Sequence, residues 1–197
     1  MPNFMNELST IFSTWHIIRA AGLTAYLLLF LTTAGGLLLS LQTVPAKYRS
    51  SITNIHNTVA LTGILFTLLH LSALLFDKQI HFSLADVFIP FWSSYQALDS
   101  TLGIIAFYLM VILTLVSIPA IMKRVGYRMW RSIHHLAFLC YWIALYHSVV
   151  LGTDSSNMFV STLYIFTGVI VVSLISLRVK KSMQGRGSHY AHSARGR

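Results

Sequence analysis

Five long apolar runs restrict this chain to a membrane-spanning fold. They cover approximately residues 17–41, 52–76, 98–121, 133–151 and 159–177. Each is long enough to cross a hydrocarbon core of about 30 Å, which takes about 20 residues of helix. Backbone groups in hydrocarbon must find partners within the protein, and these runs lack the alternation of barrel strands. The sequence therefore predicts an all-α integral membrane bundle of about five transmembrane helices, a multi-pass protein of the cell membrane.

The few charged residues are distributed unevenly between these runs. Only 10% of the 197 residues are charged, and the net charge is +9. All of the 14 Lys and Arg residues except Arg19 and Lys78 follow the first, third or fifth run, whereas the 5 acidic residues lie in the opposite segments. Basic loops stay in the cytoplasm. We therefore expect the N-terminus outside and the C-terminus in the cytoplasm, and we attribute the basic charge to orientation rather than to nucleic acid.

The remaining segments predict a single domain with two appendages. We expect an interfacial lead over residues 1–16, the membrane domain over residues 17–180, and a basic, disordered cytoplasmic tail over residues 181–197, which is rich in Gly, Ser and Arg. The loop over residues 77–100 is aromatic and is expected to lie among the lipid headgroups and to cap the outer half of the bundle. A single cysteine, Cys140, excludes an internal disulfide, a cysteine-ligated iron–sulfur cluster and covalently attached haem.

Two of the apolar runs carry a histidine near each end, where ionisable side chains are expensive. The second run has His56 and His70, and the fourth has His134, beside His135, and His147. At 1.5 Å of rise per residue, the two histidines of each run lie about 20 Å apart. They therefore form a cytoplasmic level and an outer level. Opposed imidazoles at two levels suit bis-axial ligation of two stacked, six-coordinate haems.

Two points stay open from the residues alone. Buried histidines often serve only as hydrogen-bonding groups between helices, so a haem-free transporter or assembly protein is an alternative. The spacing in the fourth run is also awkward. At about 100° per residue, His147 lies about 140° around the helix from His134, or about 120° from His135. Either this helix is distorted, or its two histidines approach the haems from different sides.

Residues 55–70 (IHNTVALTGILFTLLH) and 128–147 (RMWRSIHHLAFLCYWIALYH) carry a family resemblance. They resemble the ferric reductase-like transmembrane domain of ferric reductases, NADPH oxidases and the haem subunit of bacterial methionine sulfoxide reductase systems. The resemblance covers about residues 15–180. It implies two non-covalent b-type haems, with His56 and His134 as ligands of the inner haem and His70 and His147 as ligands of the outer haem.

Further residues complete the expected site. The resemblance implies that Arg19 lies near the outer haem, where it would pair with a propionate, although snorkelling to the interface explains it equally well. His135 would hydrogen-bond a propionate. Gly63, midway between the two histidines of its run, would let a macrocycle or aromatic ring approach closely. Four aromatic residues are expected between the levels, as core packing or as conductors: Phe66, Phe138, Tyr141 and Trp142.

Two departures from the family pattern shape the functional expectation. NADPH oxidases resemble one another in a further histidine four residues after the outer ligand, where this chain has Leu74, so superoxide production is not expected. No flavin or nicotinamide domain is expected after residue 177, where the sequence has no G-x-G-x-x-G. The electron donor is therefore expected to be a separate flavoprotein reductase or a membrane quinol.

The sequence thus predicts an electron-transfer subunit without acid or base catalysis. It would pass electrons from a donor on the cytoplasmic side to an acceptor outside, as part of a ferric reductase-like membrane oxidoreductase system. The same scaffold acting as a quinol-oxidising subunit of a periplasmic reductase is the alternative within the haem hypothesis.

Overall fold

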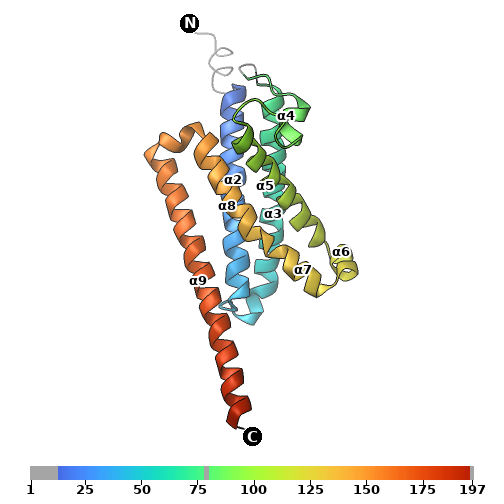
Figure 1. The fold of residues 1–197 in the computed structure, drawn as a ribbon, viewed down its shortest axis with the longest axis vertical. Helices are drawn as coiled ribbons and strands as arrows, with labels where there is room; N and C mark the ends of the chain where they lie inside the picture. The colour runs from blue at the N-terminus through green and yellow to red at the C-terminus, as the bar shows by residue number, and fades with distance from the viewer. Residues whose placement is uncertain (1–12, 78–79, 196–197) are drawn as a thin grey trace.

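The chain forms a bundle of helices in the computed structural model, which describes residues 13–77 and 80–195, with side chains to residue 184 (Figure 1). The helices are α2 (Thr14–Ser40), α3 (Ala46–Leu75), α4 (Leu84–Phe88), α5 (Ala97–Val116), α6 (Pro119–Val125), α7 (Tyr127–His134), α8 (Leu136–Leu151), the 3₁₀ turn η1 (Thr153–Ser156) and α9 (Met158–Arg195). No strand occurs among these described residues. The predicted all-α fold is confirmed.

Five segments are long and apolar enough to cross a membrane, in agreement with the sequence. They are α2, α3, α5, α7 together with α8, and α9 as far as Gln184. The third span ends at Val116 rather than near residue 121, because Pro119 disfavours helical backbone at the residue before it. Ile118 accordingly has an extended conformation, and a new short helix, α6, begins at the proline.

The structure describes part of each predicted appendage. Residues 1–12 of the interfacial lead lie outside the described residues, and Thr14 to His16 belong to α2. Helix α9 continues to Arg195, into the tail of residues 181–197 for which the sequence predicts disorder. An established helix lengthens with one new hydrogen bond per residue, so its growth needs no new nucleus. The division into a lead, a domain and a tail stays a prediction.

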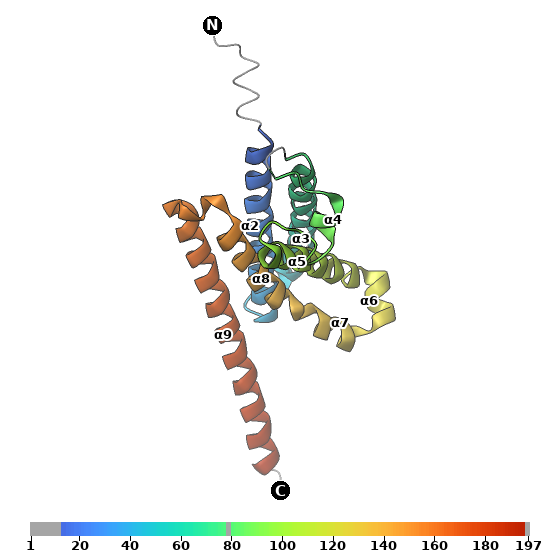
Figure 2. The same ribbon diagram turned by 45° about the horizontal axis from the view of Figure 1, so that its top comes forward.

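Packing is organised around α2. This helix lies along α3 over most of its length and also contacts α8 and α9, while α8 lies along α5. Helix α3, which carries His56 and His70, has almost no direct contact with α8, which carries His147. Figure 2 shows α9 on one flank and α6 with α7 projecting on the other. The bundle therefore keeps α3 and α8 apart instead of packing them together.

A buried aromatic cluster fills the contact of α2 with α8 and α9. The Tyr26 ring stacks on the Tyr141 ring at a centroid distance of 6.2 Å and meets the Tyr164 ring edge-on at 5.1 Å. The Tyr26 and Tyr141 hydroxyls are 3.3 Å apart, and Tyr26 also hydrogen-bonds Thr167. Since each phenol finds a polar partner, the cluster combines apolar packing with satisfied hydroxyls. The cluster packs α8 against α2 and α9.

Candidate cofactor-binding site

The fourth span is broken in its first half, which resolves the angular problem of its two histidines. Helix α7 ends at His134, His135 occupies a turn, and α8 begins at Leu136. At this point the Phe138 amide donates to the His135 carbonyl, three residues back, at 3.2 Å. The rotation of about 100° per residue of a regular helix therefore does not hold across this junction. The distorted helix, one of the two alternatives left by the sequence, is therefore confirmed.

The inner pair consists of two opposed imidazole rings from different helices. The centroids of the His56 and His134 rings are 6.3 Å apart, with an angle of 56° between the planes. A metal–nitrogen bond of about 2 Å, with the ring centre about 1 Å behind the nitrogen, places two rings on one metal about 6 Å apart. The Nδ1 atoms of both rings are buried without a hydrogen-bond partner. The pair therefore has both the spacing and the unsatisfied polar atoms that fit a bis-histidine metal.

The outer pair shows the hydrogen bonds typical of metal-binding histidines. His70 Nδ1 lies 2.9 Å from the Ile18 carbonyl oxygen, and His147 Nδ1 lies 2.8 Å from the Asp99 carbonyl oxygen. A carbonyl oxygen only accepts, so we assign the proton to Nδ1 and the lone pair to Nε2 in both rings. A ligating imidazole usually donates its other N–H in this way, which fixes the ring and its tautomer.

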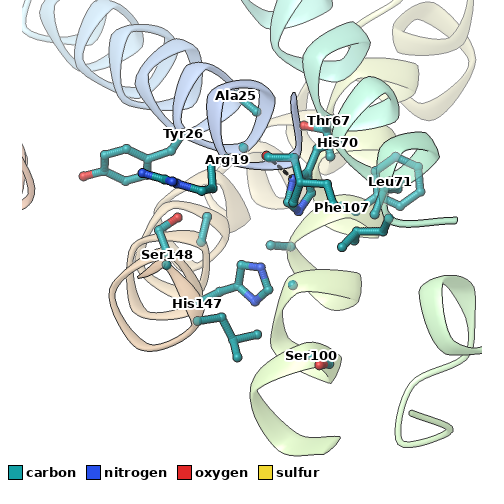
Figure 3. Close-up of a pocket in the computed structure, with 18 of the residues that line it drawn as sticks. Arg19, Ala25, Tyr26, Thr67, His70, Leu71, Ser100, Phe107, His147 and Ser148 are labelled. Atoms are coloured by element: carbon teal, nitrogen blue, oxygen red, sulfur yellow. Dashed lines mark hydrogen bonds between the residues drawn. The ribbon is translucent and has the colours of Figure 1, made fainter. Parts of the chain in front are cut away.

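Both outer rings border a cavity at the α4 end of the bundle (Figure 3). The cavity has a volume of about 210 Å³. Its lining is mainly apolar, and Phe82, Val87 and Tyr95 cover it from the loop between α3 and α5. This part of the loop caps the outer half of the bundle, as its aromatic content predicted.

Three of the four histidines lie against a glycine on a neighbouring helix, a feature that the sequence analysis missed. A Cβ atom added to Gly22 would lie 3.0 Å from His70 Nδ1, and one added to Gly36 would lie 3.2 Å from His56 Cε1. At Gly103 the added atom would lie 2.7 Å from His147 Nδ1. Real Cβ contacts are almost never shorter than 3.0 Å. A glycine therefore makes room for each of these three rings.

The secondary site residues are placed as follows. Arg19 lines the outer cavity and forms an ion pair with Asp154 of η1, in which Nε donates to Oδ2 at 2.7 Å. His135 is exposed, and its Nε2 accepts from the Arg178 guanidinium at 3.0 Å. A Cβ at Gly63 would meet only side chains of α2 and α5 at 3.5 and 3.7 Å, which is ordinary helix packing. The predicted roles of Arg19, His135 and Gly63 toward a cofactor stay predictions.

The predicted aromatic residues divide between the core and the periphery. Tyr141 is fully buried and packs on Tyr26 and Phe30. Trp142 meets the Tyr141 ring edge-on, and Phe138 packs beneath the Arg178 guanidinium. These contacts support the packing interpretation for Tyr141 in particular.

Trp130 is a further neighbour of the inner pair that the sequence analysis did not single out. Its ring stacks on the His134 ring at a centroid distance of 5.0 Å and an angle of 25°. The indole Nε1 donates to Ser117 Oγ at 3.2 Å, which anchors the ring to the end of α5. Since the four-residue spacing places both rings on one face of α7, the contact was accessible from the sequence.

The donor set favours a macrocyclic metal over a bare ion. Across residues 13–77 and 80–184, no three His, Cys, Asp or Glu side chains gather closely enough to hold a metal ion by themselves. A haem iron takes four ligands from the porphyrin and needs only two from the protein. Two separate histidine pairs therefore fit haem.

Comparison with known proteins gives one family match. Residues 17–145 match the family described as "Ferric reductase like transmembrane component". The matched region contains both members of the inner pair and His70, and His147 follows two residues after it. No curated protein matches the chain.

Proposed function

The chain belongs to the family of ferric reductase-like transmembrane components, and on that premise we propose that it is a dihaem b-type protein that moves electrons across a membrane. Haem supplies a reversible one-electron change at iron. The residues proposed to hold it are His56 with His134 at the inner level and His70 with His147 at the outer level.

The opposed imidazoles of His56 and His134 carry this proposal. Their centroid separation of 6.3 Å suits two ligands on one iron, and their unpartnered Nδ1 atoms disfavour a purely hydrogen-bonded role. The hydrogen bonds of His70 and His147 to carbonyl oxygens support the same role at the outer level. Two histidines at each site would leave no free position for oxygen on a haem iron, which would suit electron transfer.

The surrounding residues contribute placement, exclusion of water and charge. The apolar helices would limit the access of water to both sites, and the ion pair of Arg19 with Asp154 lines the outer cavity. Electrons would arrive from a donor on the cytoplasmic side, proposed as a separate flavoprotein reductase, and leave to an acceptor outside. The distribution of basic residues supports this direction.

A quinol-oxidising role is the second candidate, because the outer cavity is mainly apolar. Its lining extends from His70 and His147 to Phe82 and Tyr95, whose aromatic rings suit contact with the ring of a quinol. Stopped-flow reduction of the haem protein by a short-chain quinol and by a reduced flavoprotein separates the two candidates. Faster reduction by the quinol, abolished by filling the cavity with Val87→Phe while both haem components stay in place, would favour the quinol role.

Absorption spectra of histidine variants test the dihaem proposal. In the purified protein, His56→Ala or His134→Ala should remove one b-type component, and His70→Ala or His147→Ala should remove the other. His135→Ala is the matched control, because this exposed neighbour should leave both components in place. A colourless wild-type protein would support the haem-free alternative instead.

A further inference from the structure

The end of the molecule formed by α6 and α7 carries positive charge, and none of the carboxylates among the described residues lies there. Lys123 and Arg124 of α6 and Arg128 and Arg131 of α7 are all exposed. The carboxylates of the described residues belong to the opposite end, which also holds α4 and η1 (Figures 1 and 2). They are Asp77, Asp86, Asp99 and Asp154. We call the exposed surface of residues 119–131 the α6–α7 face.

An aromatic stack leads from this face to the inner histidine pair. The Tyr127 side chain is 66% exposed, and its ring lies 5.4 Å from the Trp130 ring. Trp130 stacks in turn on His134, which opposes His56. The hydrogen bond from the indole to Ser117 fixes the middle ring of the series. Contacting rings therefore connect the surface with the proposed inner haem site.

The composition of the face resembles that of a protein interface. Tyr127 and Met129, the latter 57% exposed, supply apolar surface within a basic surround. Interfaces combine an apolar core with a polar rim and are enriched in Tyr, Met and Arg. Attraction to anionic lipid requires only the basic charges. Binding of anionic lipid does not explain a fixed aromatic stack that ends on His134.

We propose that the α6–α7 face is the docking surface for an acidic, soluble electron-carrier protein, and that electrons reach the inner site through Trp130. This inference rests on the proposed function and specifies its donor. In the step, the carrier would lose one electron, and an iron that His56 and His134 would hold would gain it. No bond is made or broken and no proton moves. Trp130 shortens the path through which the electron tunnels and keeps its own oxidation state.

Charge-reversal variants test the docking surface. Arg124→Glu with Arg128→Glu removes four units of positive charge from the face. Lys47→Glu with Lys180→Glu removes the same charge from exposed positions outside it. The probe is oxidised flavodoxin, an acidic FMN protein, with binding to the haem-loaded protein measured in neutral detergent at low salt.

The two variants should differ although their net charges are equal. The α6–α7 variant should bind flavodoxin about tenfold more weakly, and the control should bind within about twofold of the wild type. Equal losses in both would show that only net charge matters and would overturn the docking surface. So would a wild-type protein that ignores flavodoxin but binds vesicles of phosphatidylserine through the same arginines.

Substitution of Trp130 tests the path. Trp130→Leu should slow the first-order transfer from docked, reduced flavodoxin several-fold while binding and haem content stay unchanged, and Trp130→Phe should restore most of the rate. If Trp130→Leu loses haem, Tyr127→Leu decides, since this side chain does not contact His134: an unchanged rate would overturn the path. A preparation without haem would instead defeat the proposed function, so the two failures are distinguishable.

Discussion

Glycine residues on neighbouring helices leave the space that three of the four candidate histidine ligands occupy. Gly22 and Gly36 of α2 contact His70 and His56 of α3, and Gly103 of α5 contacts His147 of α8. Any side chain at these positions must displace an imidazole or push two helices apart. The proposed haem sites therefore depend on the lack of a side chain at these glycines as well as on the histidine nitrogens.

Alanine at these glycines should remove haem from one level at a time. Gly103→Ala should displace His147 and break its hydrogen bond to Asp99, and Gly22→Ala should displace His70, so both should lose the outer haem. Gly36→Ala should weaken the inner one. Redox titration followed by absorbance measures each component separately.

Gly63→Ala is the matched control for this series. Its added methyl group meets Leu28 and Met110 at ordinary contact distances, so both haem components should remain. If Gly22→Ala, Gly36→Ala and Gly103→Ala retain both haem components as the control does, haem binding does not depend on these contacts between glycine and histidine.

The ion pair of Arg19 with Asp154 should tune the outer site through charge. A nearby cation stabilises the reduced form of a metal site and a nearby anion destabilises it. Arg19→Leu should therefore lower the midpoint potential of the outer haem, and Asp154→Asn should raise it, with little change at the inner haem. Shifts of both variants in the same direction would contradict this account.

The four ligand candidates could be predicted from the sequence, whereas their glycine partners could not. Histidine is conspicuous in an apolar run because burial of an ionisable ring needs a reason. Whether a glycine contacts such a ring depends on how neighbouring helices pack. Gly63 was singled out for its position between two histidines, yet Gly36 and Gly103 make the close contacts.

Short elements between the spans shape the two ends of the bundle. The break at His135 gives α7 a direction of its own and places Trp130 against His134. At the other end, α4 is held by a capping box. The Ser83 hydroxyl accepts from the Asp86 amide, and the Asp86 carboxylate accepts from the Ser83 amide at 2.9 Å. Helix α4 thereby covers the outer cavity with Val87.

Acid should loosen this capping box. Hydrogen bonds from the Ser83 hydroxyl and amide lower the pKa of Asp86 below its ordinary value of 3.8. A carboxyl whose pKa is lowered by folding adds stability that is fully present above its ordinary pKa and is lost as the pH falls through its folded pKa. The protection of the amides of residues 84–88 against hydrogen exchange, corrected for the intrinsic effect of pH, should therefore fall below about pH 3.8.

Asp86→Asn provides the control for the capping box. The variant should lose part of its protection at neutral pH and should show no further loss on acidification. Protection in the wild type that is unaffected by acid, or lost equally in the variant, would show that the carboxylate does not hold α4.

The spans could be predicted from apolar length alone, but these short elements could not. Helix α6 follows from Pro119, whose effect on the preceding residue was overlooked in an apolar run. The angular mismatch between His134 and His147 indicated a distortion without locating it. The extension of α9 depends on an existing helix, which the composition of the tail does not reveal.

The arrangement of the whole bundle places the candidate ligands on two sides, with His56 and His70 on α3 and His134 and His147 on the span formed by α7 and α8. Helix α2 braces α3, α5 braces α8, and α3 and α8 hardly touch. In the proposed function, two haems held between these two sides would connect the α6–α7 face with the outer cavity.

Cysteine labelling should establish the direction of this path. The native Cys140 is fully buried and provides a silent background. A membrane-impermeant maleimide added to intact cells should label Ser94→Cys, whereas Lys180→Cys should be labelled only after the membrane is opened, as the basic segments predict. The reverse pattern would place the α6–α7 face outside and exclude a cytoplasmic donor there.

The haem-to-protein ratio of the purified chain tests the central claim most directly. Pyridine haemochrome absorbance, with protein quantified by amino-acid analysis, should give about two b-type haems per chain, one for each histidine pair. A ratio near zero in protein that is folded and supplied with haem during expression would contradict the account.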